Sequence, residues 1–374
     1  MRSDRGRDTD RHAISVRKQR PHCLRWRALA LASAALVSAC GGGNGSSNDG
    51  VAVMPGLATP SPSPTPVTPP LTAEQLEDQR SSSALAVNAE VVYRAGVTGR
   101  GIKIAIIDTG LSPGLSEFSG RTDAASADLD SSRGIADQHG HGTWVSSVAL
   151  AARDGRGMHG VAYEATLVSL NVTRPATCTP QACPLSSELI TRAIDAAVAS
   201  GARVINLSFN SDYTEENLLA AVRRAVAANA VIVISAGNES ADQPLLLSRA
   251  IAGAGAGAVI IAGACDAAGR PYAFNNRAGN GAAASSYLMA LGVDVNMTGR
   301  DGSVVTYSGT SFSTPAISGA AALIAQARPN LTGAQIVSLL LNNAYDAGPP
   351  GRDEMYGNSI LDMGRAFAAL GIAG

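Results

Sequence analysis

Charged residues are scarce in this sequence of 374 residues, at 16%, and neither sign of charge dominates. The net charge of −1 hides an uneven distribution. Residues 1–39 contain nine Lys or Arg and three Asp, a net of +6, whereas the remainder has a net of −7. An acidic body has no electrostatic reason to bind nucleic acid, so no nucleic-acid partner is predicted. The basic N-terminal segment indicates a targeting signal instead.

The N-terminal segment also lacks an apolar run long enough for a transmembrane helix. Residues 28–39 form an apolar run of twelve, which is the length of the hydrophobic part of a secretory signal. The run ends in LVSAC at residues 36–40, which resembles a bacterial lipobox. We therefore predict a signal peptide at residues 1–39 and export. Lipidated Cys40 would anchor the protein to a bacterial membrane. We expect the outer membrane, with the protein facing either the periplasm or the cell surface. Ordinary cleavage after Ala39 is the alternative, giving a secreted soluble protein.

Cysteines are few as well, with five in the whole chain. Cys23 would be removed with the signal peptide, and Cys40 would carry the lipid. Export to an oxidising compartment favours a disulfide between Cys178 and Cys183, which leaves Cys265 as a single, buried and unreactive thiol.

The composition changes again after Cys40. Residues 41–50 are rich in Gly, Ser and Asn, and residues 59–70 read TPSPSPTPVTPP. The first stretch predicts flexible coil and the second an extended polyproline segment. We expect residues 40–71 to be an anchor and linker, and residues 72–374 to be one globular domain.

Apolar runs and helical periodicity alternate through the globular part. Strands are predicted at residues 102–107, 166–170, 203–208, 231–235 and 258–262, and helices at residues 143–152, 187–199, 215–228, 316–327, from 332, and at 361–370. This alternation predicts an α/β fold with a mostly parallel central sheet and helices on both faces. Ligands of such sheets bind beyond the carboxyl ends of the strands.

Three glycine-flanked motifs contain an acid, a base and a hydroxyl. Asp108 ends a predicted strand in IAIIDTG, His141 stands in HGHGT, and Ser311 stands in GTSFSTP before an apolar helix. A serine hydroxyl is a weak nucleophile that needs an adjacent base, held in the right tautomer by a third group. The chain order Asp, His, Ser is the order found in subtilisin.

The Asp-Thr-Gly sequence is also the signature of aspartic proteases. That chemistry needs two carboxylates sharing a proton. No second Asp-Thr-Gly or Asp-Ser-Gly occurs in the chain. The aspartic protease reading also leaves His141 and Ser311 unexplained.

With these motifs, residues 88–370 resemble the catalytic domain of the subtilase family, including the lead-in YRAGVTGRG at residues 93–101. The resemblance implies a subtilisin-like three-layer fold and a serine endopeptidase that works through an acyl-enzyme. It also implies that Asp108, His141 and Ser311 form the catalytic triad. Asn238 and the backbone N–H of Ser311 would then stabilise the oxyanion.

The resemblance further implies where substrate binds. Ser208, Phe209 and Asn210 follow one predicted strand, and Ala236 and Gly237 follow the next, so these residues should line the cleft. Asn210 stands where subtilisins usually have glycine. We expect Asn210 to narrow the primary specificity pocket. The sequence does not determine which substrate side chain this pocket prefers.

The expected partners are protein or peptide substrates and, through the lipid, a membrane; the sequence predicts no oligomeric state. No cofactor is expected to be required and no metal site is predicted. Calcium, used by many relatives, lacks a recognisable site, because the loop at residues 153–157 is short. An inactive subtilase-like lipoprotein that binds peptides or partner proteins is the alternative function, and the intact triad argues against it.

Overall fold

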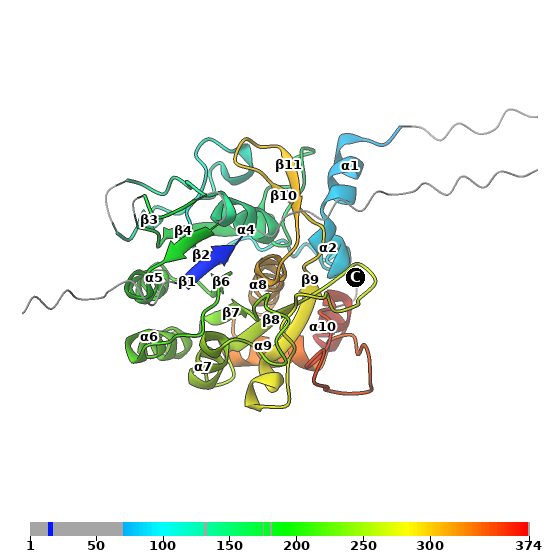
Figure 1. Cartoon of the computed structure of the whole chain (residues 1–374). Helices are drawn as coiled ribbons and strands as arrows, with labels where there is room; N and C mark the ends of the chain where they lie inside the picture. Colours follow the sequence, from blue (N-terminus) through cyan, green and yellow to red (C-terminus); the bar gives the residue numbers. More distant parts are fainter. Residues whose placement is uncertain (1–13, 18–69, 131–132, 175, 180–181, 373–374) are drawn as a thin grey trace, which may run out of the picture. The chain divides into compact units, whose positions relative to one another are not determined.

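The computed structural model describes residues 14–17, 70–130, 133–174, 176–179 and 182–372 (Figure 1). Seven strands form a central sheet in the order β3-β4-β2-β6-β7-β8-β9, and each neighbouring pair is parallel. These strands are β2 (Lys103–Asp108), β3 (Ala127–Asp128), β4 (Thr166–Asn171), β6 (Val204–Leu207), β7 (Val231–Ser235), β8 (Val259–Cys265) and β9 (Tyr287–Leu291). The predicted fold class is confirmed.

Both faces of this sheet are covered because its strands are apolar on both sides. Along β2, Ile104 and Ile106 belong to one hydrophobic cluster, and Ala105 and Ile107 belong to the other. The first face carries α4 (His141–Leu150), α8 (Thr310–Ala327), α9 (Gly333–Asn342) and α10 (Met363–Ala369). The second carries α5 (Ser187–Ala199), α6 (Glu216–Ala227) and α7 (Leu246–Ala254) (Figure 1). Strands buried on both faces are typical of parallel sheets.

The predicted elements are all present, and the largest boundary error concerns α8. This helix begins at Thr310, six residues before the predicted start at residue 316, so Ser311 lies inside its first turn. Several elements were not predicted: α1 (Ala73–Arg80), α2 (Ser82–Ala86), α3 (Glu90–Arg94), α7, β3, β5 (Ala182–Leu185), β9, the short helices η1 (Ser116–Phe118) and η2 (Ala282–Ser286), and the antiparallel hairpin of β10 (Val295–Thr298) and β11 (Val304–Tyr307).

A short strand also lies within the predicted signal peptide. β1 (Ile14–Arg17) pairs antiparallel with β5 (Ala182–Leu185), so removal of the leader would expose this edge of β5. The rest of the predicted signal peptide, Cys40 and nearly all of the predicted linker lie outside the described residues. Within the part of the chain that the structure describes, no helix has the length and apolar character needed to cross a membrane.

The N-terminal helix α1 docks on the domain through a buried carboxylate. Glu77 accepts hydrogen bonds from the backbone N–H groups of Asp154 (3.0 Å) and Gly155 (2.9 Å). Glu117 is buried nearby, and its Oε2 has no hydrogen-bond partner among the described residues. Burial raises the pKa of Glu117 to about 7, and repulsion from Asp154 and Glu77 adds to this.

This pKa predicts that Glu117 weakens the fold as pH rises. The folded state holds the Glu117 proton up to about pH 7, whereas an unfolded glutamate loses it near pH 4.3. Stability is therefore lost as pH rises through that window. Because Glu117→Gln cannot ionise, its melting temperature relative to the wild type should be higher at pH 8 than at pH 5. Glu188→Gln, on an exposed carboxylate, is the control. An equal difference at both pH values would contradict the assignment.

Candidate active site

The ends of β2 and α4 meet closely because glycine stands on both sides of the contact. Asp108 is the last residue of β2 and His141 is the first of α4, and both are buried. A Cβ on Gly142 would lie 2.3 Å from the Gly110 carbonyl oxygen, so only glycine fits there. The approach places His141 Nδ1 2.9 Å and 3.0 Å from the two carboxylate oxygens of Asp108.

This contact determines which nitrogen of His141 is basic. A carboxylate only accepts hydrogen bonds, so Nδ1–H donates to Asp108 and Nε2 keeps its lone pair. The backbone N–H of Thr109 also donates to Asp108 Oδ1, at 2.7 Å. The carboxylate therefore orients the imidazole as a base is oriented in serine hydrolases.

Ser311 lies at the start of the neighbouring helix. It is the second residue of α8 and partly exposed, and its N–H is one of the four that have no partner within a helix. The ring of the following residue, Phe312, lies 5.8 Å from the ring of His141, so the first turns of α4 and α8 lie close together. Among the described residues, Ser311 Oγ has no hydrogen bond to His141; this bond is often long without substrate.

A proline in α8 links Ser311 to the end of β6. Pro315 has no N–H, so the Ser311 carbonyl lacks its partner in the helix. Ser208 Oγ donates to that carbonyl at 2.9 Å, and Asn206 Nδ2 donates to Ser208 Oγ at 2.9 Å. The Ser311 carbonyl, which has no partner within α8, is thus hydrogen-bonded to the end of β6 and fixes Ser311 relative to the sheet.

Asn238 is oriented from the same helix start. Its Oδ1 accepts hydrogen bonds from the backbone N–H of Thr310 (2.9 Å) and from Thr310 Oγ1 (3.0 Å). Its Nδ2 donates no hydrogen bond to any described residue and so can donate to a ligand. Buried Asn276 holds the loop around Asn238, because its Oδ1 accepts from Glu239 N (3.0 Å) and its Nδ2 donates to the Ala236 carbonyl (3.2 Å).

The predicted substrate-binding residues follow two neighbouring strands. Ser208, Phe209 and Asn210 come after β6, and Ala236 and Gly237 come after β7. The side chain of Phe209 is buried in the hydrophobic cluster on the second face of the sheet, so its backbone is the part that can contact a substrate. Asn210 is half-buried between the two loops.

The sequence analysis did not single out Asp137, which organises the loop before His141. Asp137 is buried and accepts five hydrogen bonds. Its Oδ1 binds Thr109 Oγ1 (2.9 Å) and the N–H groups of His139 (3.0 Å) and Gly140 (2.7 Å). Its Oδ2 binds Thr143 N (2.9 Å) and Oγ1 (2.7 Å). One carboxylate thus joins the turn after β2 to the start of α4.

Asp137→Asn should disturb the position of His141. The amide has one acceptor oxygen where the carboxylate has two, so at least one buried N–H loses its partner, at a cost of about 1–3 kcal/mol. We expect a lower melting temperature and a kcat reduced about 10- to 100-fold with KM little changed, because a misplaced group raises the reaction barrier. Asp242→Asn, on a carboxylate whose side chain is 90% exposed, is the control. An unchanged kcat would show that Asp137 does not position the site.

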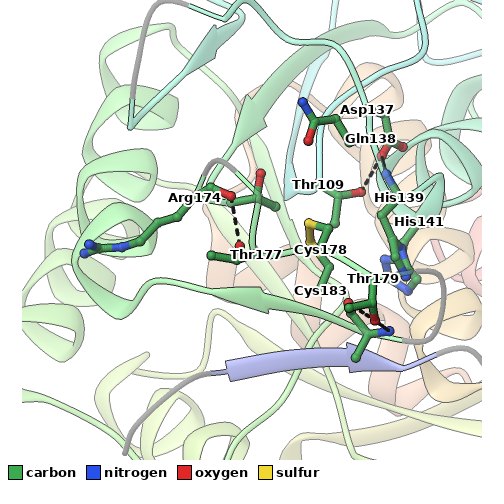
Figure 2. The surroundings of a disulfide bond; sticks show 12 residues. Thr109, Asp137, Gln138, His139, His141, Arg174, Thr177, Cys178, Thr179 and Cys183 are labelled. Atoms are coloured by element: carbon green, nitrogen blue, oxygen red, sulfur yellow. Dashed lines mark hydrogen bonds between the residues drawn. A yellow bond between two sulfur atoms is a disulfide. The ribbon is translucent and has the colours of Figure 1, made fainter. Parts of the chain in front are cut away.

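The disulfide and the neighbouring histidines lie in one region. Cys178 and Cys183 form a disulfide, which precedes α5 and includes a residue of β5, whereas Cys265 is a buried free cysteine. Figure 2 shows that the surroundings of the disulfide include His139, His141 and Asp137. Among the described residues, no group of three or more His, Cys, Asp or Glu side chains is arranged to hold a metal ion.

A histidine oriented by an acid, close to the first turn of a helix that carries a serine and at the carboxyl edge of a parallel sheet, is typical of serine hydrolases. Comparison with known proteins narrows this class. The sequence model of the subtilase family matches residues 99–359. Subtilisin Savinase from Lederbergia lenta is 30% identical over 278 residues, which cover 74% of this chain and 94% of that protein.

Two further relatives are similar over different lengths. A thermostable alkaline protease of Halalkalibacterium halodurans is 28% identical over 282 residues, or 75% of this chain and 71% of the relative. An extracellular serine protease of Serratia marcescens is 42% identical over 87 residues, which span 22% of this chain and only 8% of that relative. The chain belongs to the subtilase family of subtilisin-like serine endopeptidases, and its fold is that of the family.

Proposed function

We propose that this protein is an exported serine endopeptidase in which Ser311 is the nucleophile, His141 the general base and Asp108 the group that orients the base. The proposal rests chiefly on the buried contact between His141 and Asp108, 2.9–3.0 Å long, at the carboxyl end of β2. The peptidase domain is residues 72–374, preceded by the linker at residues 40–71.

The residues have distinct parts in the reaction. Ser311 Oγ attacks the carbonyl carbon of a peptide bond while its proton passes to His141 Nε2. The C–N bond breaks, the proton passes to the leaving amine, and the acyl group stays on Ser311 as an ester. Water then gives a proton to Nε2 while its oxygen attacks the ester carbonyl carbon, and Nε2 passes that proton to Ser311 Oγ as the ester C–O bond breaks. Asn238 Nδ2 and the Ser311 N–H donate hydrogen bonds to the oxyanion of each tetrahedral intermediate.

The substrates are proteins or peptides bound in an extended form. The loops after β6 and β7 contact the residues beside the scissile bond, and the edge of β5 can accept a further strand once the leader is removed. The chemistry requires no metal or organic cofactor, so chelation with EDTA should leave the initial rate unchanged.

A protein substrate tests the proposal. The purified protein should hydrolyse casein, and a fluorophosphonate should abolish the reaction. Binding of casein without cleavage, and without reaction with the fluorophosphonate, would instead identify an inactive subtilase-like peptide-binding protein.

We further propose that the exported protein is anchored by a lipid on Cys40. The basic segment, the apolar run at residues 28–39 and LVSAC support this. Relatives are named extracellular proteases, in Serratia marcescens and Bacillus subtilis, which agrees with export.

Cys40→Ser should move the protein from the membrane fraction to the soluble fraction. A diacylglyceryl group anchors through its buried hydrocarbon, and serine cannot carry the thioether that holds it. Fractionation and intact mass measure both effects. Cys23→Ser is the control, because Cys23 leaves with the signal peptide. Membrane-bound wild type with an unmodified N-terminus would contradict lipidation.

A further inference from the structure

The structure indicates where the side chain on the acyl side of the scissile bond must go. Ser311 Oγ attacks the carbonyl carbon, so the residue that carries this carbonyl lies against Ser311 and Asn238. Ser208, at the end of β6, donates to the Ser311 carbonyl, and Asn238 follows β7. These two strands are hydrogen-bonded neighbours, so their ends flank the site from either side. The substrate side chain on the acyl side of the scissile bond therefore enters the gap between the loop after β6 and the loop after β7.

The side chain of Asn210 crosses this gap. Its Nδ2 donates to the Ser235 carbonyl on the β7 side at 2.6 Å, and its Oδ1 accepts from the Ser211 N–H on its own side at 2.8 Å. A second hydrogen bond crosses the same gap in the opposite direction, because Ser235 Oγ donates to the Phe209 carbonyl at 2.9 Å. Both amide atoms of Asn210 are thus bound to the walls, and the side chain occupies space that a glycine would leave empty.

The start of α7 prevents the two loops from separating. The N–H of Leu245 donates to the Ala236 carbonyl at 3.1 Å, and the N–H of Leu247 donates to the Ser211 carbonyl at 3.0 Å. Ser248 Oγ adds a second donor to the Ser235 carbonyl, at 2.7 Å. Widening the gap would break several of these buried hydrogen bonds at once, each at a cost to stability. A large side chain therefore cannot open the gap for itself.

We propose that Asn210 makes this peptidase selective for small side chains, glycine, alanine or serine, on the acyl side of the cleaved bond. The inference rests on the proposed function and names its substrate class. A pocket that lacks room rejects larger side chains through lost transition-state binding, and the discrimination is about 10- to 200-fold for each methylene that does not fit. Phenylalanine should thus be a poor substrate residue in this position.

Peptides that differ only in this residue test the proposal. For the wild type, kcat/KM with alanine should exceed kcat/KM with phenylalanine by at least about 100-fold. Asn210→Gly removes the bridge and should lower that ratio at least about 10-fold. Asn229→Gly, the same change in the exposed turn between α6 and β7, should leave the ratio unchanged.

Each outcome bears on the proposal separately from the proposed function. Equal cleavage after phenylalanine and alanine by the wild type, or an unchanged ratio in Asn210→Gly, would overturn the selectivity and leave the endopeptidase intact. Cleavage of none of the peptides, with no reaction with a fluorophosphonate, would overturn both. Cleavage sites in a denatured proteome, mapped with the wild type alone, give a further test should Asn210→Gly fail to fold. Sites that follow mainly leucine or phenylalanine would overturn the proposal.

Discussion

Ser311→Ala should lower kcat by about 10⁶-fold, the size of the loss in subtilisin when its nucleophile is removed. Alanine has no oxygen to attack the carbonyl carbon, so the acyl-enzyme cannot form. Adding His141→Ala should cost little more, because the nucleophile and its base act as a unit. Single-turnover and steady-state rates on a peptide substrate measure both effects.

A neighbouring serine provides the control for this variant. Ser313 is buried two residues further along α8, and its hydroxyl donates to the Thr310 carbonyl within the helix. Ser313→Ala should keep kcat within a few-fold of the wild type and so show that a lost hydroxyl near the helix start is tolerated. If Ser311→Ala keeps a tenth of the wild-type activity, Ser311 is not the nucleophile.

Asn238→Leu should lower kcat by about 10²- to 10³-fold with little change in KM, the range that loss of one oxyanion donor costs in subtilisin. The donor acts on charge that develops in the transition state, so its loss affects kcat more than substrate binding. Steady-state kinetics with one peptide separates the two constants.

Thr310 provides the comparison for Asn238. Thr310→Val removes one of the two hydrogen bonds that hold Asn238 Oδ1 and keeps the backbone N–H that makes the other. Its kcat should fall only a few-fold, since the amide stays oriented. Equal losses in Thr310→Val and Asn238→Leu would show that Asn238 acts by holding the helix start rather than by donating to the oxyanion.

The sequence allowed most strands of the central sheet and most helices on its faces to be predicted because their patterns are local. Val231–Ser235 and Ser187–Ala199 have the predicted bounds, since a short apolar run between polar turns and a helical repeat are both visible in a window of a few residues. The start of α8 was predicted at residue 316, directly after Pro315, six residues later than it is. In the fold, the carbonyl that Pro315 leaves free is satisfied by Ser208, which is distant in sequence.

The same distinction applies to the site. Asp108, His141 and Ser311 stand in motifs that can be recognised without a structure. Asp137 was missed, because an aspartate in a loop acquires its five donors only when β2 and α4 approach each other. The bridge from Asn210 to Ser235 likewise joins two loops whose distance the sequence does not give.

Covalent labelling tests the central claim most directly. The mature protein is treated with a fluorophosphonate, digested, and mapped by tandem mass spectrometry, with loss of peptidase activity followed in parallel. Nucleophilic attack on phosphorus displaces fluoride and leaves one phosphonyl group on the enzyme. We predict that this group is found on Ser311, in proportion to lost activity, and that His141→Ala slows the labelling strongly. Full inactivation with the label on another residue, or an active enzyme that takes up no label, would contradict the account.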